Sequence, residues 1–75
     1  MKVYGVYVGV KYEGGSVMPS LYKSYAKAKR VAMDKIEFIE ADGGELSKFR
    51  KLDKEDAWCN GIDVVAIKKF NVADG

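Results

Sequence analysis

One stretch of the chain, residues 25 to 40, contains neither glycine nor proline and repeats its apolar residues with helical spacing. The apolar residues that share one side of such a helix are Tyr25, Ala28, Ala32, Ile36 and Ile39. Ser24 is a suitable N-cap before it, and Gly43-Gly44 provides a glycine C-cap after it. The flanking segments have strand character, so the sequence predicts one helix that can cover only one face of a sheet.

The N-terminal strands are predicted from alternation and from a pair of glycines. Residues 2–12 alternate with period two, and Gly14-Gly15 favours a tight hairpin turn into a second strand over residues 16–22. Pro19 cannot donate a ladder hydrogen bond, so we expect the second strand at the sheet edge. A two-residue turn at these glycines places Tyr7 opposite Tyr22.

A second hairpin follows the helix. Asn60-Gly61 is a strong two-residue hairpin signal, and it pairs Cys59 with Ile62 in front of a β-branched strand over residues 62–72. Residues 45–59 begin with spacing that fits a short helical turn and end with strand character. The prediction for residues 1–75 is a single α+β domain with ββαββ order, in which one helix packs on a four-stranded antiparallel sheet.

The hairpin turns also predict the two faces of this sheet. We expect the helix to cover the face that carries Val6, Val8, Val10, Leu21, Ile62, Val64, Ala66 and Phe70. The other face then carries Val3, Tyr7, Met18, Tyr22, Leu52, Trp58, Val65 and Ile67. A solvated sheet face is normally polar, whereas aromatic residues and methionine are enriched in contact surfaces. The exposed face is therefore expected to contact something.

The predicted partner-binding residues are Tyr7, Met18, Tyr22, Trp58, Val65 and Ile67. Gly5 and Gly9 flank Tyr7 and would let another backbone or ring approach closely. The expected partner is a protein, either a different molecule or a second copy in a homodimer. The alternative is that these are ordinary scattered apolar residues, with Tyr7 and Tyr22 as a cross-strand aromatic pair.

The net charge of +2 is too small to indicate nucleic acid by itself. Lys23, Lys27 and Arg30 form a stripe on the helix opposite its apolar side, which could contact phosphates or an acidic protein. The alternative is a solvated helix face. A second basic cluster, at Lys48, Arg50 and Lys51 around Phe49, leaves a nucleic-acid-binding module as the principal rival interpretation.

Residues for catalysis are scarce. The chain has no histidine and one cysteine, Cys59, so it offers neither a cysteine–histidine pair nor a zinc site, and we expect Cys59 to be a packing residue. We expect no enzyme activity, no metal and no cofactor. The sequence shows no membrane span and no signal peptide, so the expected location is the cytoplasm.

Two short motifs suggest a context. Ser24-Tyr25-Ala26-Lys27-Ala28-Lys29 opens the helix, and Trp58-Cys59-Asn60-Gly61-Ile62-Asp63 leads into the last strand. Together with the layout of most of the chain, they resemble small accessory proteins of tailed bacteriophages and prophages. The resemblance implies residence in the cytoplasm of a bacterial host and a role as an inhibitor or modulator that binds a host factor, including defence or transcription machinery. It assigns no functional residue.

Overall fold

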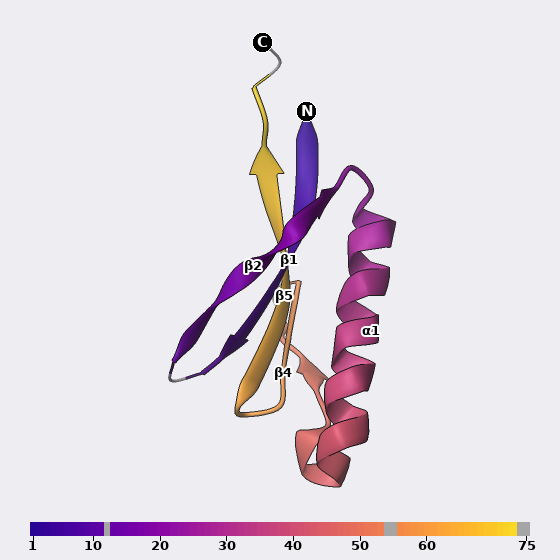
Figure 1. Cartoon of the computed structure of the whole chain (residues 1–75), viewed down its shortest axis with the longest axis vertical. Helices are drawn as coiled ribbons and strands as arrows, with labels where there is room; N and C mark the ends of the chain where they lie inside the picture. The colour runs from indigo at the N-terminus through magenta and orange to yellow at the C-terminus, as the bar shows by residue number, and fades with distance from the viewer. Residues whose placement is uncertain (12, 54–55, 74–75) are drawn as a thin grey trace.

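The computed structural model describes residues 1–11, 13–53 and 56–73, and of residues 45 and 46 it describes the backbone alone. Within these residues, one α-helix packs on a five-stranded antiparallel sheet of order β2-β1-β5-β4-β3 (Figure 1). The elements are β1 (Lys2–Val10), β2 (Gly14–Tyr22), α1 (Tyr25–Gly43), the 3₁₀ helix η1 (Gly44–Ser47), β3 (Arg50–Lys51), β4 (Ala57–Cys59) and β5 (Asp63–Asn71). The α+β class is confirmed, but the sheet has a fifth strand that the sequence did not predict.

Helix α1 begins and ends where its capping residues predict. The Ser24 hydroxyl accepts a hydrogen bond from the Lys27 N–H at 3.3 Å. At the other end Gly44, with φ of 69°, donates its N–H to the Glu40 carbonyl. The helix runs along one side of the sheet, from the end where both chain termini lie to the opposite end (Figure 1). Among the described residues, no helix has the length and apolar character needed to cross a bilayer.

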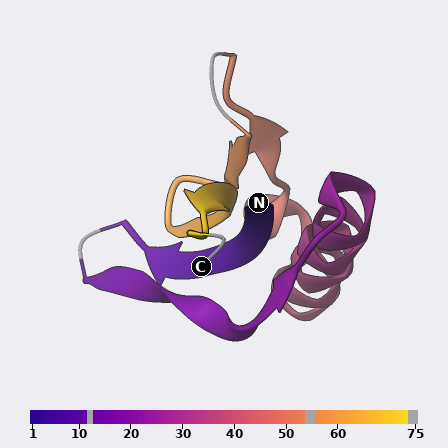
Figure 2. The same ribbon diagram turned by 90° about the horizontal axis from the view of Figure 1, so that it is seen from above.

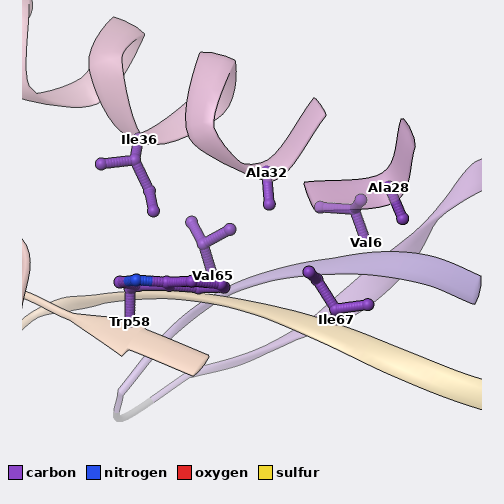
Figure 3. Packing of buried hydrophobic residues seen from close by; sticks show 7 residues of the cluster. All are labelled: Val6, Ala28, Ala32, Ile36, Trp58, Val65 and Ile67. Atoms are coloured by element: carbon purple, nitrogen blue, oxygen red, sulfur yellow. The ribbon is translucent and has the colours of Figure 1, made fainter. Parts of the chain in front are cut away.

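The main cluster of the core lies between α1 and one face of the sheet. Ala28 and Ala32 are fully buried and Ile36 is nearly so, and all three point from the helix toward the strands (Figure 3). They meet four side chains from β1, β4 and β5, which are Val6, Trp58, Val65 and Ile67. The two alanines bring the helix backbone close to the sheet, as the helical spacing predicts.

Strand β2 lies at the edge of the sheet, as Pro19 predicts. Its register differs from the prediction, because Val10 faces Gly14 and the turn therefore precedes Gly14. Gly14 has φ of 77°, a left-handed backbone conformation that glycine adopts without strain. An irregularity in the β1–β2 pairing between Gly5 and Tyr7 shifts the strands further. Tyr22 consequently pairs with Tyr4 and not with Tyr7.

The second hairpin turns one residue later than predicted. Cys59 faces Val64, so Gly61 and Ile62 occupy the turn, and Gly61 has φ of 96°. This shift moves both strands together and leaves their faces unchanged. The segment before the turn, which was expected to end in one strand, forms two short strands: β4 and the two-residue β3, which pair with each other. β5 instead pairs along its whole length with β1.

The β1–β5 pairing decides which residues the helix covers. Val8 faces Val65 and Val6 faces Ile67, so even-numbered residues of β1 share a face with odd-numbered residues of β5. The sequence analysis placed even-numbered residues of β1 and even-numbered residues of β5 on the same face, and this placement is wrong for β5. Val64, Ala66 and Phe70 therefore lie on the side away from α1. Leu21 also lies there, because it pairs with Gly5 in the β1–β2 ladder, while Val6 and Val8 lie under α1 as expected.

Candidate functional site

The candidate site is the sheet face that turns away from α1, called here the uncovered face. Strand register places the following described residues on it: Val3, Gly5, Tyr7, Gly9, Val17, Leu21, Arg50, Ala57, Cys59, Val64, Ala66, Lys68 and Phe70. Figure 2 shows that α1 lies to one side of the sheet only. This face contains mostly apolar residues, and α1 does not lie over it. Val3, Ala57 and Ala66 on this face are nevertheless buried, whereas Leu21 and Phe70 are exposed.

Only one of the predicted partner-binding residues lies with its side chain on this face. Tyr7 does so and is half-buried. Trp58, Val65 and Ile67 are buried beneath α1, with exposed fractions of 8%, 0% and 8%. Met18 and Tyr22 are partly buried and pack against the same core. The predicted placement of these five residues on the exposed face is wrong, because it followed from the incorrect strand register.

Three side chains from two strands gather over Gly5. An added Cβ at this glycine would lie 2.7 Å from Cγ1 of Val17, 3.0 Å from Cδ2 of Leu21 and 3.2 Å from Cε2 of Phe70. Val17 and Leu21 come from β2 and Phe70 from β5, the two strands that flank β1. Because Gly5 has no side chain, these three side chains occupy the space above it. We call Val17, Leu21 and Phe70 the Gly5 cluster. Leu21 remains 52% exposed and Phe70 39% exposed.

A second glycine on the same face accommodates Tyr7. An added Cβ at Gly9 would lie 2.7 Å from the Tyr7 hydroxyl and 3.0 Å from Cε1 of its ring. The Lys68 ammonium stands over this ring, 5.5 Å from its centroid. The sequence predicts that the glycines beside Tyr7 allow a close approach, and the approaching groups are the chain's own side chains.

The far corner of the uncovered face carries the only cysteine of the chain. Cys59 lies half-buried at the side of a shallow hollow, where its neighbours include Arg50, Leu52 and Gly61. Its Sγ accepts a hydrogen bond from the Gly61 N–H at 3.3 Å. The thiol therefore supports the β4–β5 turn, in line with a packing role.

The helix surface is the second place where predicted residues lie. Lys23, Lys27 and Arg30 are all exposed, as the spacing predicts. Asp34 lies in the same shallow grooves as Lys27 and Arg30 and reduces the positive field there. Phe38, at 70% exposure, has the Lys35 ammonium 5.6 Å from its ring centroid. The stripe is accessible, but its charge is mixed.

A pKa shift occurs at the start of α1, where Tyr25 lies. The Tyr25 hydroxyl donates a hydrogen bond to Asp56 Oδ1 at 2.9 Å. This hydrogen bond, with smaller contributions from burial and from the Asp56 charge, raises the pKa of Tyr25 above its ordinary value. Tyr25 also packs edge-on against Tyr4, with ring centroids 5.6 Å apart. In the described parts of the chain, no group of three or more Asp, Glu or Cys side chains is arranged to hold a metal ion.

Searches against protein-family models, curated protein sequences and solved structures find no match to this chain. The site is therefore interpreted from its own geometry. The sequence missed Leu21 and Phe70, which it assigned to the core. One signal could have found them: Gly5 shares a face with Tyr7, and a glycine in a central strand leaves a space that large side chains of neighbouring strands must fill.

Proposed function

We propose that this protein is a small non-enzymatic binding module whose uncovered face contacts another protein. The observation that supports it best is the Gly5 cluster, where Leu21 and Phe70 lie together on a sheet face that no helix covers and remain 52% and 39% exposed. Contiguous apolar surface of this kind is typical of protein contact sites. The resemblance to phage accessory proteins is compatible with a bacterial host protein as the partner.

The edge of the sheet is a poorer contact site than its face. β2 is nine residues long and forms one edge, but its pairing with β1 is irregular and it contains Pro19. A proline and an irregular backbone are devices that prevent edge-to-edge pairing with another chain. The other edge, β3, has only two residues. Side-chain contact through the uncovered face is thus favoured over addition of a strand.

The experiment is a comparison of two double variants. In Leu21→Ser/Phe70→Ser both apolar groups leave the uncovered face. The matched control, Phe38→Ser/Ile62→Ser, removes two apolar side chains that are 70% and 63% exposed elsewhere on the molecule. Tagged proteins are used to capture partners from a bacterial lysate, and the captured protein is then purified and its affinity measured by calorimetry.

We expect that the Leu21→Ser/Phe70→Ser protein no longer binds the purified partner, and that the control binds it with the affinity of the parent protein. Circular dichroism must show that both variants are folded, because the Gly5 cluster also contributes to packing. If a partner binds the Leu21→Ser/Phe70→Ser protein normally and does not bind the control, the contact surface includes Phe38 on α1 or Ile62 in the β4–β5 turn, and the proposal is contradicted.

A further inference from the structure

The charges of the uncovered face indicate what kind of protein it contacts. Strand register places two charged residues of the described strands on this face, Lys68 and Arg50, and both are cationic and exposed. Asp63, the acidic residue of β5, lies on the opposite face and accepts a hydrogen bond from Asn60 Nδ2 at 3.3 Å. The described strands thus present apolar and basic groups on the uncovered face. Asp53, which follows β3, lines the same hollow as Arg50 and offsets its charge, so Lys68 is the cation that matters beside the apolar centre.

Lys68 stands beside the apolar centre of the face. It pairs with Gly5 in the β1–β5 ladder, so its backbone is adjacent to the floor of the Gly5 cluster. Its side chain extends over the Tyr7 ring. A ligand that packs on Leu21 and Phe70 therefore passes within reach of a positive charge.

We infer that the partner is an acidic protein segment, in which apolar side chains pack on the Gly5 cluster and a carboxylate lies near Lys68. This inference rests on the proposed function and deepens it. Complementary charge around an apolar centre raises the association rate and selects among partners. It makes an acidic partner the one best suited to this surface.

The same charges disfavour a second copy of the chain. In a twofold dimer the same patch meets itself, so the cations of each face approach cations of the other. Asp53 lies beside Arg50 at the far corner of this face. The described strands place no acidic side chain next to Lys68, so the repulsion there is not compensated. Like charges brought together in an interface are a common means of excluding a wrong partner.

The aromatic rings disfavour single-stranded nucleic acid. Base stacking requires an open ring face. The Tyr7 ring lies against Gly9 and has the Lys68 ammonium group over it, and the Phe70 ring lies against Gly5. The aliphatic side chains of Leu21 and Val17 offer no stacking surface. The cationic and apolar groups of this face therefore match an acidic polypeptide better than a nucleic acid.

The test is a titration followed by NMR, with three synthetic peptides as probes. The first combines Phe and Leu with Glu, the second has Lys in place of every Glu, and the third has Ser in place of Phe and Leu. Two variants of the protein test the site, Lys68→Glu and Lys69→Glu. They change the net charge identically, but Lys69 faces Tyr4 on the helix side of the sheet.

We expect the acidic apolar peptide alone to shift the amide signals of Val17, Leu21, Lys68 and Phe70. Its affinity should fall severalfold between about 0.05 M and about 0.5 M salt. Lys68→Glu should weaken it by at least about fivefold, and Lys69→Glu by less than about twofold.

Several outcomes would overturn the inference. Equal binding of the basic peptide, equal loss in both lysine variants, or no shift with any peptide would show that charge does not select the partner. Saturable binding of oligo-dT at this face would identify nucleic acid. Light scattering that shows a dimer abolished by Leu21→Ser/Phe70→Ser would identify a second copy. Each of these leaves the capture experiment above as the separate test of the proposed function.

Discussion

The ring of Tyr7 lies over Gly9, two residues farther along β1 on the same face of the sheet. A Cβ at Gly9 would come within 2.7 Å of the Tyr7 hydroxyl. Because side chains alternate with period two in a strand, residues 5, 7 and 9 share this face. Each glycine of VYGVYVGV thus leaves room for other side chains. Side chains from the neighbouring strands occupy the space at Gly5, and the Tyr7 ring occupies the space at Gly9.

This relationship predicts that Gly9→Ala and Tyr7→Ala interact. Alone, Gly9→Ala should lower the free energy of unfolding by about 1–2 kcal/mol, because the methyl group must displace a packed ring. In the Tyr7→Ala background the methyl group has room, and Gly9→Ala should be neutral or stabilising, since alanine loses less backbone entropy than glycine. Urea unfolding of the four proteins gives the coupling energy. Strictly additive effects would show that the ring does not occupy the space at Gly9.

The helix–sheet contact gives a second prediction, at Ala32. This residue is fully buried against the sheet, and Ala32→Leu should cost about 1–3 kcal/mol because the added atoms overfill a packed core. The matched control is Ala41→Leu on the exposed side of the same helix, which should change stability by less than about 0.5 kcal/mol. Trp58, the only tryptophan, is buried in the same core and reports unfolding by its fluorescence. Equal stability of the two variants would contradict this packing.

The elements that could be predicted from the sequence are those specified by neighbouring residues. Ser24 and Gly44 cap α1 where expected, and the buried positions of the helix follow from its spacing. Pro19 correctly places β2 at an edge because it lacks an amide hydrogen, which is a property of one residue. In each case the signal lies within a few residues of the feature that it predicts.

The pairing of β1 with β5 could not be predicted in this way. No turn joins these two strands directly, so no nearby residue indicates that Val8 pairs with Val65 rather than with Val64. A change of one residue in register moves every side chain to the other face. The β1–β5 error placed Trp58, Val65 and Ile67 on the exposed face and Phe70 in the core, and the separate β1–β2 register error placed Leu21 in the core. An exposed apolar surface was therefore predicted, but most of its residues were not.

The β4–β5 turn gives a third prediction, at Asn60. Its Oδ1 accepts hydrogen bonds from the N–H groups of Ile62 and Asp63 at 3.0 and 2.6 Å, and its Nδ2 donates to the Ser47 carbonyl at 3.1 Å and to Asp63 Oδ2. Asn60→Asp keeps the acceptor but loses the donors and places two carboxylates together. We expect a loss of about 1–3 kcal/mol at neutral pH.

The loss in Asn60→Asp should decrease below about pH 4, where a protonated carboxyl group can donate again. Asn60→Ala removes the donors and the acceptor together, and its loss should be independent of pH. Chemical unfolding of both variants and the parent protein across this range makes the comparison. If Asn60→Asp is equally destabilised at all pH values, the contact with Asp63 does not contribute.

The last prediction concerns the hydrogen bond between Tyr25 and Asp56, which ties the start of α1 to the start of β4. Tyr25→Phe should lower the free energy of unfolding by about 0.5–1 kcal/mol at neutral pH, since both groups are partly solvated. The folded protein raises the pKa of Tyr25, so it holds the phenolic proton more tightly than the unfolded chain does. The stabilisation is therefore complete below about pH 10, the ordinary pKa, and is lost as the pH rises through the folded value.

The parent protein should thus be more stable than Tyr25→Phe at neutral pH, and this advantage should disappear as the pH rises through the folded pKa of Tyr25. The two proteins share every other ionisable group, so the difference between them isolates Tyr25. Asp56→Asn, which removes the negative charge and keeps a carbonyl acceptor, should reduce the dependence on pH. Urea midpoints of the three proteins test this directly. A stability difference between parent and Tyr25→Phe that persists unchanged to high pH would mean that the phenolic proton is not held by Asp56.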